Sequence, residues 1–149
     1  MSEKRLYDLT EMRERRNAMP GLWRTLGYEL RSWDRGAATV AWHAIPEYGF
    51  KTDSGYVVQG GLVTALLDAA MGSACWTVLD DTQTFLTADL RTEFLRSSRP
   101  GELCATGTVV RRTRAVVFCA GELCDAEGTL LATSRCTQVV LPSGGRAGR

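Results

Sequence analysis

The chain has 149 residues and a mass of 16.3 kDa, which is enough for one domain with its own core. Its composition, 44% hydrophobic and 23% charged, excludes disorder for most of the chain, and a net charge of +1 argues against nucleic acid as the main partner. No charge-free apolar run is long enough to span a bilayer, and the N-terminus lacks the apolar segment of a secretory signal, so we expect a cytoplasmic protein with no membrane partner.

The first third of the chain is predicted to contribute a helix and then a hairpin. Leu6, Leu9 and Met12 recur at a spacing of three among many charged residues, which indicates a short amphipathic helix ending before Pro20. The pattern then changes to alternation on both sides of a polar turn at residues 34–36, which is typical of a hairpin. The expected elements are, in order, a helix over 6–19, a strand over 22–33, a strand over 37–45 and a loop over 46–58.

The middle of the chain holds its longest apolar stretch, VVQGGLVTALLDAAMGSACWTVL over residues 57–79. After Gly60 and Gly61 this stretch predicts a helix that is apolar or small on nearly every side, and such a helix is buried. Asp68 is the one charged residue in it. A carboxylate is rarely buried without a partner, because losing its hydration is costly. Two interpretations stay open: a structural aspartate paired with a group elsewhere, or a catalytic carboxylate.

After residue 79 the chain is predicted to form one strand after another. Apolar runs alternate with short polar turns at even spacing, which indicates an antiparallel meander. The expected strands cover 85–95, 102–111, 115–124 and 129–141. About six strands and one apolar helix make an α+β domain over residues 21–141, between an N-terminal helical segment (1–20) and a disordered tail (142–149). The open sheet edges and the uncovered sheet face predict a homo-oligomer.

Cysteine and histidine usage argues against a metal site and against a serine triad. The five cysteines lie inside apolar patterns, there is no C-x-x-C, and His43 is the only histidine. We therefore expect small buried thiols in a reducing compartment and no metal. The chain has no G-x-S-x-G elbow, so His43 is interpreted as an ordinary strand residue.

Three motifs occur in order: V-x-x-G-G-L-V-T-A-L-L-D-A-A-M-G, then LRTEFLRSSRPGEL, then VVRRTRAVVFCAGELCDAEGTLLATSRCTQVVL. In these motifs the chain resembles the hot-dog-fold acyl-CoA thioesterases, in particular the phenylacetate-pathway type, over about residues 20–141. The resemblance implies an antiparallel sheet wrapped around one long helix, and protomers that pair edge to edge into dimers and often into dimers of dimers. It also implies hydrolysis of an acyl-CoA thioester, with coenzyme A as part of the substrate and no other cofactor.

The resemblance assigns roles to four positions. The free N–H groups near Gly60 would polarise the thioester carbonyl, and Asp68 would attack it directly or activate water. Eight residues separate these two positions, roughly 12 Å along a helix, so one thioester can meet both only if they come from two subunits. Thr87 matches a position where relatives orient the water, although a β-branched residue also suits a strand. Gln59 replaces the usual histidine and can still donate a hydrogen bond.

The resemblance also suggests residues for the rest of the substrate. Gly61 would lie beside the carbonyl, and Phe50, Tyr56 and Met71 would line the acyl pocket, although core packing explains such residues equally well. Cations in loops and turns would meet the coenzyme A phosphates, or would simply be solvated. The candidate arginines are Arg96, Arg99, Arg112 and Arg114.

Two other functions share much of this pattern. A non-catalytic acyl-CoA-binding protein of the same fold would keep Asp68 for structural reasons alone. A hot-dog dehydratase would need a histidine together with a carboxylate, and His43 lies in a strand before the central helix. The sequence therefore favours thioester hydrolysis, with the binding protein as the alternative.

Overall fold

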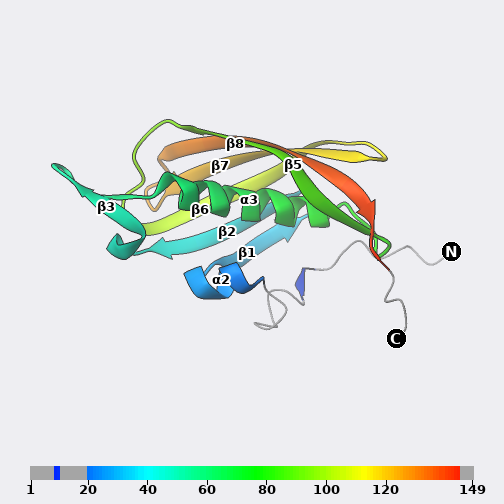
Figure 1. Cartoon of the computed structure of the whole chain (residues 1–149), viewed down its shortest axis with the longest axis horizontal. Helices are drawn as coiled ribbons and strands as arrows, with labels where there is room; N and C mark the ends of the chain where they lie inside the picture. The colour runs from blue at the N-terminus through cyan, green and yellow to red at the C-terminus, as the bar shows by residue number, and fades with distance from the viewer. Residues whose placement is uncertain (1–8, 11–19, 145–149) are drawn as a thin grey trace.

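The computed structural model describes residues 9–10 and 20–144, and it shows one antiparallel sheet with a long helix across one face (Figure 1). The sheet has six strands in the order β1-β2-β6-β7-β8-β5. In that order the strands are β1 (Glu29–Asp34), β2 (Ala37–Ala44), β6 (Gly101–Arg112), β7 (Val116–Asp125), β8 (Leu130–Pro142) and β5 (Gln83–Phe94). This arrangement confirms the predicted α+β class. Strands β6, β7 and β8 form a meander as predicted, whereas β5, expected to be its first strand, pairs with β8 at the edge of the sheet rather than with β6.

Helix α3 (Gly60–Trp76) packs one side against the sheet. Leu67 and Met71 are fully buried on that side and lie against Gly121. At Gly107 a Cβ atom would stand 2.4 Å from the Ala70 carbonyl oxygen, so glycine is required for the helix to come this close to the sheet. The core is therefore formed between the helix and the middle strands of the sheet.

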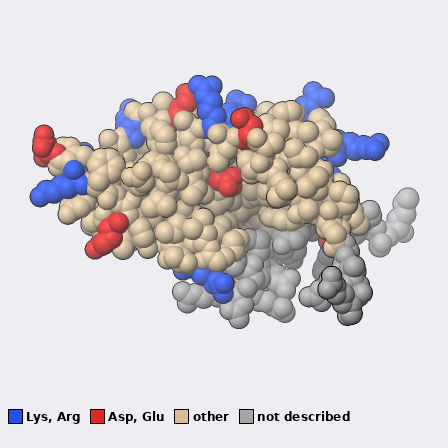
Figure 2. All heavy atoms as spheres, viewed as in Figure 1, with Lys and Arg blue, Asp and Glu red and all other residues tan. Residues whose placement is uncertain are grey.

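The other side of α3 is open, which differs from the predicted burial on all sides. Gly61 is exposed, and Ala65, Asp68, Gly72 and Trp76 are half-buried. These positions recur at helical spacing and form one stripe of mostly small side chains. On the face seen in Figures 1 and 2, charged side chains lie mostly along the margins and most of the surface between them is uncharged. One copy of the chain therefore leaves part of its central helix uncovered.

Strand β5 forms an edge of the sheet beside this open stripe. The pairing of β5 with β8 shifts register between Thr87 and Asp89, which is a bulge at Ala88. Because of the bulge, Thr87 and Leu90 stand opposite Gln138 and Cys136, two buried residues of β8. The Leu90 side chain and the Phe94 side chain farther along the strand are nevertheless exposed. This end of the strand is therefore only partly covered on its helix side.

The first third of the chain departs from prediction. Residues 22–33, expected as one strand, form the short helix α2 (Gly21–Leu26) followed by β1. Helix α2 starts after Pro20, and Gly27 ends it in the left-handed conformation at φ 82°, which glycine adopts without strain. The expected hairpin is present between β1 and β2, with its turn at residues 35 and 36.

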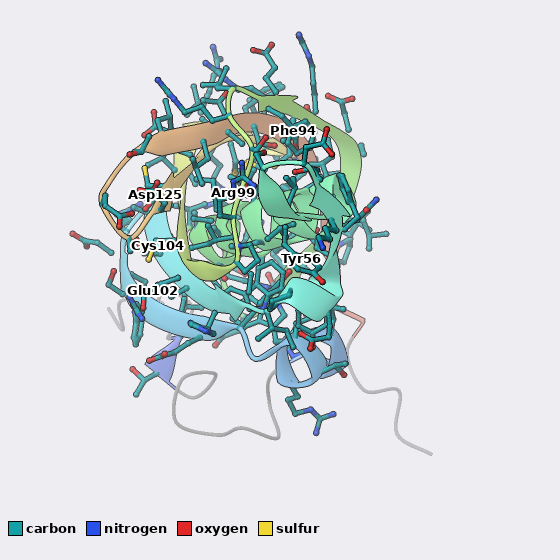
Figure 3. All side chains as sticks on the ribbon, turned by 90° about the vertical axis from the view of Figure 1, so that its left-hand side faces the viewer. Tyr56, Phe94, Arg99, Glu102, Cys104 and Asp125 are labelled. Atoms are coloured by element: carbon teal, nitrogen blue, oxygen red, sulfur yellow. The ribbon has the colours of Figure 1, made fainter. Side chains whose placement is uncertain are left out.

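The predicted loop over 46–58 also has structure of its own. It contains a 3-10 turn, η1 (Pro46–Tyr48), and a two-stranded hairpin, β3 (Gly49–Thr52) with β4 (Gly55–Val58). Arg99 donates hydrogen bonds to the Ser54 and Tyr56 carbonyl oxygens at 3.1 and 3.2 Å, which ties the hairpin to the loop after β5. Figure 3 shows Tyr56, Phe94 and Arg99 at the same end of the molecule. The predicted helix over 6–19 and the end of the predicted tail lie almost wholly outside the described residues.

Candidate active site

Asp68 lies in the middle of α3 on its half-open side, facing the edge strand β5. The Thr87 hydroxyl lies 3.4 Å from Asp68 Oδ1. Among the described residues Asp68 forms no ion pair. Burial raises the pKa of Asp68 above its usual range, and a Thr87 hydroxyl that donated to the carboxylate would partly oppose that rise. The site therefore keeps a carboxylate that is short of hydrogen-bond partners and ready to accept a proton.

The negative charge of Asp68 also affects the pKa of two groups on neighbouring elements. Tyr28, just before β1, is buried between Trp23 and Trp42. Its pKa is raised first by burial and then by the negative charge of Asp68. Cys136 on β8 is also buried, and its pKa is raised by a hydrogen bond with Cys119, by burial and, more weakly, by Asp68. Both groups are neutral at ordinary pH, so neither supplies a cation to the carboxylate.

An apolar pocket of about 280 Å³ opens beside Asp68. Trp23 and Leu22 of α2, Trp76 of α3 and Phe85 of β5 provide most of its wall. The rings of Trp76 and Phe85 meet edge to face, with centroids 4.9 Å apart, which fixes that side of the pocket. The pocket is therefore apolar and aromatic, and its polar lining residues are Asp68, Ser73 and Thr87.

The start of α3 has a different character. Gln59 is the N-cap residue; its carbonyl oxygen accepts from Leu62 and Val63, and its side chain caps nothing. Within the described residues, the N–H groups of Gly60 and Gly61 have no backbone partner. Such free donors at a helix start, together with the helix dipole, stabilise a partial negative charge that lies close to them.

A second cavity, of about 460 Å³, lies at this helix start. Phe50 of the β3–β4 hairpin, Phe94 at the end of β5, Arg96 and Gly60 are part of its lining. A side chain at Gly60 would meet the Phe94 ring at 3.2 Å, so the ring lies directly over the glycine. This cavity and the pocket beside Asp68 have no lining residue in common. Within one chain, the structure brings Asp68 and Thr87 together and leaves Gly60 apart from both.

Two of the residues proposed for substrate binding lie elsewhere. Met71 is fully buried on the sheet side of α3 and lines neither cavity, so we do not retain it as an acyl contact. Tyr56 lines neither cavity, whereas Phe50 lines the cavity at the helix start. Within a single chain, Phe50 therefore lies beside Gly60 and not beside Asp68.

The candidate arginines fall into two groups. Arg96 lines the cavity at the helix start and donates to the Leu130 carbonyl oxygen at 2.9 Å. Arg112 donates to the Val78 carbonyl oxygen and to Gln83, at the other end of α3. Arg114 is exposed in the turn after β6, near Arg112 in the sequence. Arg99, as described above, holds the hairpin. Only Arg96 therefore lies beside Gly60 in the same chain.

Gln138 of β8 and Trp23 of α2 were not predicted as site residues. Gln138 is fully buried in β8, where its side chain contacts Thr87. Its sequence setting gave no sign of this contact, because β8 also holds Ser134, Arg135 and Thr137, so one more polar residue does not stand out. Trp23 was expected in a strand rather than a helix, so its position in the Asp68 pocket was missed as well.

Comparison with known proteins agrees with this fold. The thioesterase superfamily matches residues 55–132, more than half of the chain, and the chain belongs to that family. No curated protein sequence matches the chain. Membership supports thioester hydrolysis in general as the class of reaction, and the sheet wrapped on one helix is its hot-dog fold.

Solved structures show the same fold over nearly the whole chain. A thioesterase from Haemophilus influenzae is 19% identical with a TM-score of 0.81, covering 97% of this chain and 98% of that one. A thioesterase family protein from Silicibacter pomeroyi is 18% identical with a TM-score of 0.79, covering 91% and 100%. A candidate thioesterase from Ralstonia eutropha JMP134, described as phenylacetic acid degradation-related, is 28% identical with a TM-score of 0.78, covering 88% and 98%. No helix of the described residues is long and apolar enough to cross a membrane.

Proposed function

We propose that the protein hydrolyses acyl-CoA thioesters to the free acid and CoA at a site formed by two subunits. Asp68 of one subunit would act on a thioester whose carbonyl oxygen accepts a hydrogen bond from the N–H of Gly60 of the partner subunit. The observation that supports this most strongly is the half-buried Asp68 carboxylate, which has no cation among the described residues and opens onto an apolar pocket. A structural aspartate would instead be expected to have a cation or several donors around it.

The edge strand supports the two-subunit site. β5 is 12 residues long, and two copies related by a two-fold axis near its middle would pair antiparallel. The first half of one strand would then lie opposite the second half of the other. Thr87, beside Asp68, is in the first half, and Phe94, over Gly60, is in the second. This pairing brings the Asp68 pocket of one subunit towards the helix start of its partner.

The uncovered surfaces support the same pairing. Leu90 and Phe94 are exposed on the helix side of β5, beside the half-open stripe of α3. A second α3 lying alongside would cover both surfaces, and the small residues of the stripe would let the two helices approach closely. A homodimer would also remove the long β5 edge, which otherwise offers unpaired backbone groups to any chain.

The chemistry follows from the two halves of the site. Asp68 takes a proton from a water molecule while the water oxygen forms a bond to the carbonyl carbon, and the carbonyl oxygen gains negative charge next to the helix start. The C–S bond then breaks, and the CoA sulfur takes the proton that Asp68 holds. Each subunit thus supplies what the other lacks, either a proton acceptor or a set of backbone donors.

The two cavities suggest where the substrate lies. The aromatic pocket beside Asp68 suits the acyl group, in place of the predicted Phe50, Tyr56 and Met71. The cavity at the helix start suits the pantetheine chain and, through Arg96, a phosphate group. Arg112 and Arg114 lie towards the opposite end of α3 from Gly60 of the same chain. Any contact that they make with CoA would therefore be at the site whose Gly60 comes from the partner subunit.

The test is a turnover assay with a panel of aromatic and medium-chain acyl-CoAs, read by the release of free thiol. We expect wild-type turnover and a loss of about 10²- to 10⁴-fold in kcat for Asp68→Asn, the range for removing a general base. The variant should keep its fold, because the amide has nearly the shape of the carboxylate. Tight binding of acyl-CoA without turnover would instead identify the non-catalytic binding protein of the same fold.

A further inference from the structure

Gln138 is a fully buried amide directly opposite Thr87 in the pairing of β5 with β8. Its Oε1 atom accepts a hydrogen bond from the Thr87 hydroxyl at 2.8 Å, and its Nε2 atom donates to Cys136 Sγ at 3.2 Å. Burying an amide costs free energy unless its polar atoms are satisfied, and an apolar residue would fill the same space without that requirement. The amide therefore needs an explanation other than packing.

The two distances at Thr87 decide where its proton points. A threonine hydroxyl has one proton to donate and two lone pairs that accept. Its oxygen lies 2.8 Å from Gln138 Oε1 and 3.4 Å from Asp68 Oδ1, and O–H···O bonds are typically close to the shorter value. The proton is thus held by Gln138, and the lone pairs of Thr87 remain for the side on which Asp68 lies.

We propose that Gln138 is a positioning residue that turns Thr87 into a hydrogen-bond acceptor for the attacking water. The inference rests on the proposed function. The water has two O–H bonds: one proton goes to Asp68 as the oxygen attacks, and the other O–H donates to Thr87 Oγ1. With both protons directed in this way, a lone pair of the water faces the carbonyl carbon. A Thr87 that donated its own proton to Asp68 would compete with the water for the carboxylate.

The same arrangement assigns the chemical role of Asp68. A carboxylate that attacked the thioester directly would need no acceptor for a second water proton, whereas a general base does. The groups that face Asp68 from the elements around it are Thr87 on β5, Cys136 on β8 and Tyr28 before β1, and none of them is a cation. The direction of the Thr87 proton is therefore a main control on how readily Asp68 binds a proton.

The test variant is Gln138→Met, which keeps the volume and removes the strong acceptor. The freed Thr87 hydroxyl should donate to Asp68, so the acid limb of the kcat/KM–pH profile should move to lower pH while kcat falls about tenfold, the size of one lost hydrogen bond or slightly more. In a Thr87→Val background, Gln138→Met should change neither quantity further. A carbon NMR titration of the Asp68 carboxyl follows the same proton equilibrium without turnover.

Two controls separate positioning from packing. Cys119→Ala removes a buried core group that is paired with Cys136 and does not touch Thr87, so it should lower thermal stability and leave the acid limb unchanged. Gln138→Glu keeps an acceptor for Thr87 and adds an acidic group, so it should move the acid limb to higher pH, opposite to Gln138→Met. It also provides the test if Gln138→Met does not fold.

The outcomes distinguish this inference from the proposed function. An active wild type whose kcat and acid limb are unchanged by Gln138→Met would overturn the positioning role. So would an equal effect of Gln138→Met with and without the Thr87 hydroxyl. A wild type that hydrolyses no acyl-CoA would overturn the proposed function, and the NMR titration would still decide which group receives the Thr87 proton.

Discussion

The first turn and the middle of helix α3 differ in almost every chemical respect. The first turn offers free backbone N–H groups at Gly60 and Gly61, a cavity with two phenylalanines and the cation Arg96. The middle offers the Asp68 carboxylate, a hydroxyl and an aromatic pocket. One region stabilises negative charge and the other accepts a proton, and about 12 Å of helix separates them. The comparison teaches that the helix holds two half-sites that a single chain cannot join.

The largest expected effect comes from keeping the two regions in separate molecules. Leu90→Arg puts a charge on the exposed helix side of β5 and should give a folded monomer. Because both half-sites then lack their partner, we expect kcat/KM to fall by about 10³-fold or more. Size-exclusion chromatography and turnover check this. Phe118→Arg, an equal change at an exposed side chain of the central strand β7, is the control and should keep both the dimer and the activity. A fully active Leu90→Arg monomer would show that one chain is sufficient.

Damage to the first turn alone should have the next largest effect. In Gly60→Val the new side chain meets the Phe94 ring and occupies the space that the thioester carbonyl needs. Removing one oxyanion donor costs about 10²- to 10³-fold in kcat, and we expect a loss in that range. The pH profile should keep its acid limb, because Asp68 is untouched. A shift of that limb in Gly60→Val would mean that the helix start affects the proton equilibrium of Asp68, and that the two regions do not act independently.

Damage to the middle region without loss of the carboxylate should be milder. Thr87→Val removes the hydroxyl oxygen proposed to accept the second O–H of the attacking water, so kcat should fall by about tenfold. Gln138 already holds the Thr87 proton, so the acid limb of kcat/KM should stay where burial of Asp68 places it, above the usual range of the pKa of a carboxyl. Thr87→Ser should restore kcat. An unchanged kcat in Thr87→Val would limit this residue to a strand-forming role.

The smallest expected effect concerns the coenzyme. Arg96→Ala removes the cation of the first-turn cavity, so KM for acyl-CoA should rise about fivefold with little change in kcat. A short thioester without the phosphates should be unaffected. Arg135→Ala, on the opposite face of the sheet, is the matched control. Equal effects of the two substitutions would point to general charge rather than to phosphate binding.

The elements with strong periodicity were predictable from the sequence. Helix α3 and strands β5 to β8 were predicted to within about two residues, because their apolar patterns are long and bounded by polar turns. The prediction of one strand over 22–33 was wrong. A short helix begins after Pro20 and ends at Gly27, and its apolar spacing also suits a strand. The hairpin over 49–58 was missed, since two four-residue strands carry too little pattern.

The candidate site was only partly predictable. Asp68 stands out as a charge in an apolar helix, and the glycine pair marks the helix start, so both could be identified from one chain. Gln138 could not, because its role depends on the register between β5 and β8 and on the bulge at Ala88, which set which residues face each other. Met71 fails for a similar reason: whether it faces a cavity or the core depends on the rotation of α3 against the sheet.

The most direct measurement of the two-subunit site is complementation between two inactive variants. Asp68→Asn and Gly60→Val are purified separately, mixed, partly unfolded and allowed to reassociate. A heterodimer has one site with an intact Gly60 from one subunit and an intact Asp68 from the other, so random exchange should restore about a quarter of wild-type activity. No recovery in a mixture that demonstrably contains heterodimers would contradict the account, because it would assign both groups of each site to one chain.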